Sequence, residues 1–92
     1  MALFAVEYTY APGAAATRDE FRPEHRAWLG AQHEAGALQM VGPYPDGTGA
    51  LLMITADDLA GAHAMIAHDP FAREKAIEAV RVNEWVQVFG PY

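Results

Sequence analysis

The sequence contains no cysteine, so neither a disulfide nor a thiolate zinc site can support the fold. Basic residues are also few: six Lys and Arg against twelve Asp and Glu give a formal charge of −6. This charge weighs against nucleic acid or an anionic membrane surface as a partner. No apolar run reaches the length of a transmembrane helix, and the N-terminus lacks the basic region and apolar core of a signal peptide. By default we expect a cytoplasmic protein.

The chain is short, and its 92 residues leave room for only one domain, residues 1–92. A chain of this size buries only about 60–65% of its unfolded surface, so its core is marginal unless something adds to it. The composition is nevertheless 52% hydrophobic, which is generous for a small monomer. Because cysteine-based support is excluded, oligomerisation is the remaining common route to a larger core.

The apolar patterns and the turn residues predict the element order β-α-β-β-α-β. We expect strands at 2–10, 37–41, 50–55 and 80–89, a helix at 59–68, and a short helical segment from Pro70 to about Ala76. The first long helix begins either at Thr17, where Thr17–Glu20 has the form of a capping box, or at Arg22 after one loose turn. We favour a helix that is continuous by about Pro23 and ends at Gly36. This order is typical of the ferredoxin-like fold, an α+β fold with a four-stranded antiparallel sheet and helices on one face.

Two of the expected strands are apolar on both faces. In the segment 50–55 apolar residues occupy both alternating sets, and in the segment 80–89 valines alternate with Trp85 and Phe89. A sheet that is apolar on both faces, with helices on only one, must cover its second face with another sheet. We therefore predict a homodimer in which the open sheet faces close into an α+β barrel.

His25 lies on the apolar stripe of the first helix, four residues after Phe21 and three before Trp28. Taken alone, such a residue is more often a satisfied interior histidine, and Asp69 before Pro70 is by local rules an N-cap. In the predicted topology, however, both residues reach the same end of the fold. A carboxylate that accepts the proton of one imidazole nitrogen leaves the other nitrogen free to act as a base. Capping and pairing are compatible because a carboxylate has two oxygens.

An apolar pocket around the free nitrogen would be a usual small-molecule site. Arg22 faces either an anionic substrate or, on the simpler interpretation, solvent. His33, His63 and His68 show no helical zinc spacing, so we expect neither a metal nor another cofactor. The candidate substrate-binding residues are Tyr8, Arg22, Trp28, Pro43, Tyr44 and Phe71.

Several short motifs, in this order and spacing, resemble the YCII-related (YciI-like) family. They are Arg22-Pro23-Glu24-His25, Gly36, Gly42-Pro43, Asp69-Pro70-Phe71 and the last strand with Trp85. The likeness extends from the first strand to Phe89. It implies a dimeric α+β barrel with a catalytic pair at His25 and Asp69. One branch of the family acts as a dehydrochlorinase on chlorinated hydroxyquinols, and muconolactone isomerases and small monooxygenases share the fold. His68 departs from the pattern, and it either competes for the carboxylate of Asp69 or lies in solvent.

Two functions from different classes are compatible with these observations. The first is a small, cofactor-independent enzyme of the lyase or isomerase type, in which His25 abstracts a proton from a small cyclic or aromatic substrate and Asp69 orients it. The second is a non-catalytic ligand-binding or accessory dimer, in which the pair binds a small acid or only orders this end of the fold.

Overall fold

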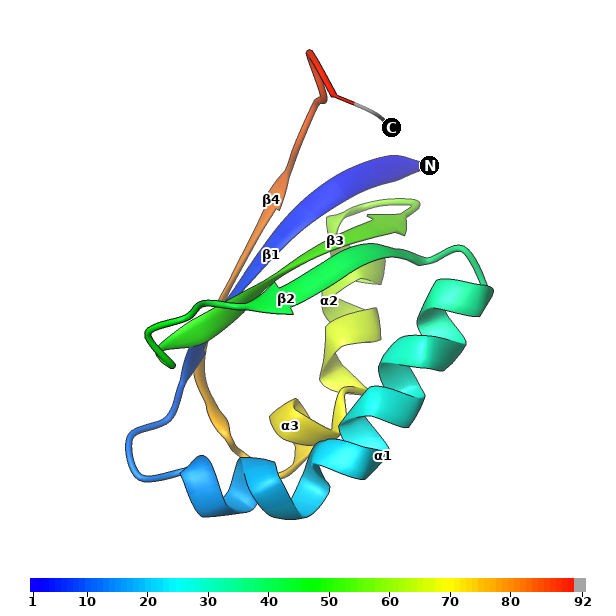
Figure 1. The fold of residues 1–92 in the computed structure, drawn as a ribbon. Helices are drawn as coiled ribbons and strands as arrows, with labels where there is room; N and C mark the ends of the chain where they lie inside the picture. The colour runs from blue at the N-terminus through cyan, green and yellow to red at the C-terminus, as the bar shows by residue number, and fades with distance from the viewer. Residues whose placement is uncertain (91–92) are drawn as a thin grey trace.

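The structure is a computed structural model that describes residues 1–90 (Figure 1). Its elements are β1 (Ala2–Tyr10), α1 (Ala15–Glu34), β2 (Leu38–Pro43), β3 (Gly49–Ala56), α2 (Leu59–Ala67), α3 (Pro70–Arg73) and β4 (Ile77–Glu84). The predicted β-α-β-β-α-β order is confirmed, with α3 as a single extra turn after α2. Within residues 1–90, no helix is both long and apolar enough to cross a bilayer.

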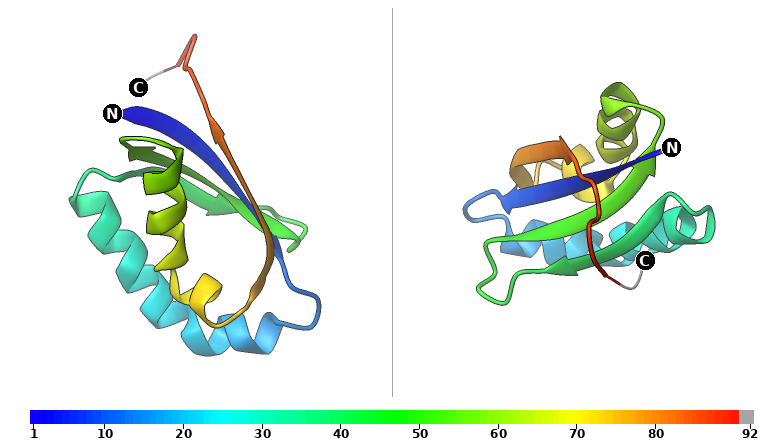
Figure 2. Two further views of the ribbon diagram at one scale, coloured as in Figure 1. Left: turned by 180° about the vertical axis from the view of Figure 1, so that it is seen from behind. Right: turned by 90° about the horizontal axis from the view of Figure 1, so that it is seen from above.

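The four strands form one antiparallel sheet in the order β2-β3-β1-β4. All three helices lie on one face of this sheet, so the ferredoxin-like prediction is confirmed (Figures 1 and 2). Side chains alternate along β1, and Phe4, Val6 and Tyr8 are buried on the helix-covered face. The core therefore lies between the central strands and the helices.

The helix α1 begins at Ala15, two residues before Thr17. The predicted capping box at Thr17–Glu20 is therefore wrong. Ala14 is the N-cap and makes no side-chain cap. The first intrahelical bond runs from the N–H of Arg18 to the carbonyl of Ala14, which places Thr17 within the first turn. Pro23 lies inside the helix, where it donates no hydrogen bond and crowds the preceding turn. Figure 1 shows that α1 bends between its first turns and the rest.

The last strand was predicted at 80–89, and both of its ends differ in the structure. It starts at Ile77 because β1 extends to Tyr10, which pairs with Ile77. It ends at Glu84, which pairs with Phe4, and the last ladder bond is from the N–H of Trp85 to the carbonyl of Leu3. Beyond this bond the chain leaves the sheet, although β1 extends to Ala2.

The second face of the sheet carries large apolar side chains, as the pattern of 50–55 predicted. Leu52 and Ile54 are fully buried on the helix-covered face, whereas Leu51 and Met53 lie on the other face. The segment of residues 85–90 crosses this open face (Figure 2, right). Between the segment and the sheet lies a groove of about 480 Å³ lined by Leu3, Gln39, Met40, Leu51, Met53, Thr55, Trp85, Gln87, Phe89 and Gly90.

Candidate active site

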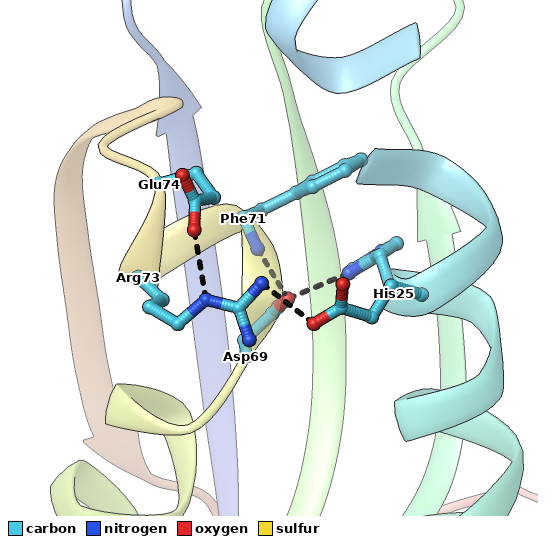
Figure 3. Close-up of polar contacts among 6 residues, drawn as sticks. His25, Asp69, Phe71, Arg73 and Glu74 are labelled. Atoms are coloured by element: carbon cyan, nitrogen blue, oxygen red, sulfur yellow. Dashed lines mark hydrogen bonds and ion pairs between the residues drawn. The ribbon is translucent and has the colours of Figure 1, made fainter. Parts of the chain in front are cut away.

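The structure brings His25 and Asp69 together, although they are 44 positions apart in the chain. Nδ1 of His25 on α1 lies 2.7 Å from Oδ1 of Asp69, the N-cap of α3 (Figure 3). His25 is carried inward by the same face of α1 as Phe21 and Trp28, as the helical spacing predicted. The predicted pairing is confirmed as a contact.

Asp69 is fully buried, and three donors converge on its carboxylate. Oδ1 accepts from the backbone N–H of Phe71 at 2.9 Å as well as facing His25, and Oδ2 accepts from the hydroxyl of Tyr8 at 2.7 Å. An ionised carboxylate only accepts hydrogen bonds, so it is the form that satisfies all three contacts. Capping and pairing thus share one oxygen, and the second oxygen goes to Tyr8.

Tyr8 holds Asp69 from the sheet side. Burial of the phenol, together with the negative charge of Asp69, raises the pKa of Tyr8 far above its ordinary value. The hydroxyl therefore stays protonated and donates to Asp69 throughout the physiological range. Tyr8 is itself buried, so it supports the carboxylate from behind.

The imidazole of His25 is fixed by two neighbours. Its ring stacks on Phe71, with centroids 3.8 Å apart and planes 5° from parallel, and Asp69 engages Nδ1. Because Asp69 accepts only, Nδ1 carries the proton in the neutral ring, and Nε2 is the nitrogen available as a base. The side chain of His25 is 12% exposed, so the base is desolvated yet reachable.

A cavity of about 400 Å³ opens beside His25. It is bounded by α1, by the end of β2 with the connection to β3, and by α3. Its lining consists of Tyr10, Arg18, Arg22, His25, Arg26, Leu29, Val41, Gly42, Pro43, Gly47, Ala50 and Phe71. Apolar walls with a few polar groups are the usual form of a small-molecule site.

Of the predicted substrate-binding residues, Arg22, Pro43 and Phe71 line this cavity. Tyr8 lies behind Asp69 instead, because alternation along β1 turns it into the core.

The other two predicted residues also lie away from the cavity. Trp28 packs against the main core, and the hydroxyl of Tyr44 donates to Glu7 at 2.7 Å, a bond that raises the pKa of Tyr44. The sequence reasoning missed Arg18 and Arg26, although their spacing of four residues on either side of Arg22 was a usable signal.

One ion pair at the surface joins α3 to α1 next to His25 and Asp69, and a second lies within the end of α3. The guanidinium of Arg73 lies 2.6 Å from Glu24 of α1 and 2.9 Å from Glu74, and both carboxylates raise its pKa (Figure 3). Such exposed pairs contribute little to stability, so they orient α3 more than they strengthen it. His68 is exposed, and within residues 1–90 the polar partners of the Asp69 carboxylate are Tyr8, His25 and the backbone N–H of Phe71. The same residues contain no group of three or more His, Asp or Glu side chains that could hold a metal ion.

The YCII-related domain model matches residues 2–86 of the chain. The chain belongs to the YCII-related family. No curated protein matches it.

Solved structures share the fold of this YCII-related chain. A 5-chloro-2-hydroxyhydroquinone dehydrochlorinase (TftG) from Burkholderia phenoliruptrix AC1100, solved with 2,5-dihydroxybenzoquinone, is 24% identical with a TM-score of 0.83, over 94% of this chain and 95% of that one. PA3566 from Pseudomonas aeruginosa is 16% identical with a TM-score of 0.60, over 95% and 93%. An antibiotic biosynthesis monooxygenase is 13% identical with a TM-score of 0.61, over 96% and 99%. At these identities the likeness establishes the fold.

Proposed function

We propose that this protein is a small, cofactor-independent enzyme of the lyase or isomerase type, with His25 as the general base. The observation that carries this proposal is the 2.7 Å contact between Nδ1 of His25 and a fully buried Asp69, at the edge of a cavity of about 400 Å³. The substrate is a small cyclic or aromatic molecule, a class that a cavity of this size accommodates.

The base would work as follows. Nε2 of His25 takes a proton from the substrate, and the imidazolium that forms is stabilised by the negative charge of Asp69. Asp69 does not move, because Tyr8 and the backbone N–H of Phe71 hold its two oxygens. In a dehydrochlorination the reacting species is the ring tautomer with chlorine on a saturated carbon. His25 takes the proton of a neighbouring C–H or conjugated O–H bond, the electrons of that bond form a new double bond in the substrate, and chloride leaves with the electrons of its bond to carbon. In an isomerisation His25 returns the proton to another atom of the substrate.

The structural neighbour suggests which reaction to test first. TftG is described as a dehydrochlorinase of 5-chloro-2-hydroxyhydroquinone, and its fold covers 94% of this chain. Chlorinated hydroquinones are therefore the first substrates to offer, followed by lactones. In this proposal Arg22, Pro43 and Phe71 contact the substrate, and Tyr8 positions Asp69.

A non-catalytic ligand-binding dimer is the second candidate. The observation that favours it is that Asp69 is already occupied as the N-cap of α3, with a bond of 2.9 Å from the N–H of Phe71. On this proposal the pair orders the end of the fold and recognises a small acid, and no bond of the ligand is broken.

We also propose that the protein is a homodimer formed through the open sheet face. Met40 and Leu51 on that face are 44% and 39% exposed, and Phe89 in the crossing segment is 92% exposed. Large apolar side chains grouped in this way are typical of a protein contact surface.

A turnover screen separates the two candidate functions. Wild-type protein, His25→Asn and His25→Ala are assayed against chlorinated hydroquinones and lactones, with His63→Asn as the matched control because His63 is an exposed histidine on α2. We expect both His25 variants to lose activity by about 10²-fold or more, and the control to keep it. Turnover that survives both His25 substitutions excludes His25 as the base, and ligand binding without any turnover favours the second candidate.

A further inference from the structure

Positive charge is concentrated at the cavity beside His25. The chain has six Lys and Arg residues against twelve Asp and Glu, yet three of its arginines, Arg18, Arg22 and Arg26, line this one cavity. Half of the basic side chains of this acidic protein, whose formal charge is −6, therefore line a single cavity. We call these three residues the arginine row.

Helix stability does not explain the arginine row as a whole, although Arg22 forms an ion pair with Asp19 on the same helix. The members of the row are spaced by four residues on α1, so they share one side of the helix. Like charges at this spacing repel each other and weaken a helix. Their placement therefore needs another reason, and an anion in the cavity would supply it.

The three guanidinium groups differ in how far neighbours already occupy them. Arg22 lies 2.6 Å from the carboxylate of Asp19, and Arg18 lies over the ring of Tyr10, 4.1 Å from its centroid. Burial raises the pKa of Tyr10 above its ordinary value, and the charge of Arg18 partly offsets this rise. Among residues 1–90, Arg26 forms no ion pair, so its donors are available to a ligand.

The rest of the cavity is apolar and suits a ring. Leu29, Val41, Pro43, Ala50 and Phe71 line it beside the arginine row. Phe71 also stacks on His25, so this aromatic wall continues to the proposed base. A planar ring on the apolar wall would present its substituents to the guanidinium groups, whose forked donors match a carboxylate.

We infer that the cavity binds anionic ring compounds, with an aromatic carboxylate as the preferred class, and that the arginine row selects them over neutral ones. Arg26 and Arg22 engage the anionic group, and Arg18 adds to the local positive field. The binding of an aromatic acid in this cavity is independent of the proposed function. The further claim that the bound acid is also the substrate rests on the proposed function.

Benzoate and benzamide test this inference, because they have nearly the same shape and differ in charge. Each is titrated into the full-length ¹⁵N-labelled protein at low salt, and amide shifts give the Kd and the location. We expect benzoate to bind at least 10-fold more tightly than benzamide, with shifts on α1 and the β2–β3 connection. We expect 0.5 M NaCl to weaken benzoate and leave benzamide nearly unchanged, because salt screens charge.

Two variants with equal loss of charge show whether the position of the charge matters. Arg26→Gln removes a cation from the cavity, and Lys75→Gln removes one that is outside the cavity lining. We expect Arg26→Gln to weaken benzoate about 5- to 10-fold without changing benzamide, and Lys75→Gln to change benzoate less than 2-fold.

Equal affinity for the two probes, no binding of either, or equal effects of the two variants would overturn the inference. These results are distinct from failure of the proposed enzyme. If a neutral substrate is turned over in a reaction that depends on His25, the proposed enzyme is supported and the inference about the arginine row is wrong. If benzoate binds selectively but no substrate is turned over, the inference is supported and the proposed enzyme is not.

Discussion

At the scale of single residues, the site depends on Asp69. This carboxylate is fully buried and is held by donors from β1, α1 and the backbone of α3, so it is fixed before any ligand arrives. In the proposed reaction this fixed negative charge orients the imidazole of His25 and stabilises the imidazolium that forms when Nε2 takes the proton of the substrate. The charge of Asp69, and not only its shape, should therefore matter.

Asp69→Asn separates charge from shape. The amide oxygen can still accept from Phe71 and His25, and the hydroxyl of Tyr8 can turn to accept from the amide nitrogen. We expect the fold to persist, with kcat reduced by about 10²-fold because a neutral amide does not stabilise the imidazolium. Kinetics on the best substrate of the screen measures this loss, and unchanged kcat would contradict the role given to Asp69.

Tyr8→Phe removes one donor from Asp69 while preserving the ring. We expect the free energy of unfolding at pH 7 to fall by about 1.5–3 kcal/mol, because Oδ2 of Asp69 is left buried without its hydrogen bond. Urea unfolding measures this change. A loss below about 0.5 kcal/mol would mean that Tyr8 does not support the carboxylate.

The pKa of Tyr8 adds a prediction about alkaline pH. A tyrosine in the unfolded chain ionises near pH 10, roughly its reference value, whereas in the folded protein the pKa of Tyr8 is raised by burial and Asp69. Below about pH 10, the contribution of Tyr8 to the free energy of unfolding is fully present. Above it the unfolded state binds fewer protons than the native state, so stability falls as pH rises. We expect this fall to be shallower in Tyr8→Phe, and parallel curves for the two proteins would contradict it.

At the scale of residues, the sequence predicted the position of a side chain correctly only where spacing and topology determine that position. His25 was placed inward by helical periodicity, and topology brought it to Asp69. Tyr8 was predicted as a substrate-binding residue, but alternation along a strand does not tell a pocket wall from a core position. Its partner is 61 positions away, and only the packed structure shows the bond.

At the scale of elements, β1 and β3 approach closely at Gly49. A Cβ added to Gly49 would overlap the carbonyl oxygen of Tyr8, so the two strands would have to separate there. We expect Gly49→Ala to lower the free energy of unfolding by about 1–3 kcal/mol or more, and to disturb the position of Tyr8.

Gly30→Ala is the matched control, because a Cβ at this position of α1 meets nothing within 4 Å. We expect it to raise the free energy of unfolding by about 0.5–1 kcal/mol, through helix propensity alone. Chemical unfolding of both variants makes the comparison. Equal effects of the two substitutions would show that the close approach of β1 and β3 is not required.

The bounds of elements were the part of the fold that the sequence predicted least well. Strand β4 starts at Ile77 because its pairing with β1 extends to Tyr10, and the residues of β4 carry no sign of that pairing. The helix α1 begins without a side-chain cap, so the capping pattern at Thr17 was misleading. Both errors arise where tertiary contacts overrule a local pattern.

At the scale of the whole molecule, the open sheet face should control assembly. Leu51→Glu places a charge in the proposed contact surface, and Leu59→Glu places the same charge on α2, at a residue that is 50% exposed. We expect the wild type and Leu59→Glu to sediment as dimers at micromolar concentration and Leu51→Glu as a monomer. A wild-type monomer, or a Leu51→Glu dimer, would contradict the proposed interface.

The overall fold could be predicted from the sequence, because few topologies are compatible with this order of elements and with strands that are apolar on both faces. The path of residues 85–90 across the open face was not, since a short apolar segment after the last strand has the same pattern whether it pairs or crosses. That segment covers part of the surface that the proposed dimer would use.

The central claim is that Asp69 holds His25 with a proton on Nδ1 and none on Nε2, the nitrogen available to the cavity. The ¹⁵N chemical shifts of the His25 ring, measured at a pH where the ring is neutral, test it most directly. The predicted result is protonated Nδ1 and unprotonated Nε2 in the wild type, with this preference lost in Asp69→Ala. A proton on Nε2 in the wild type would contradict the proposed base.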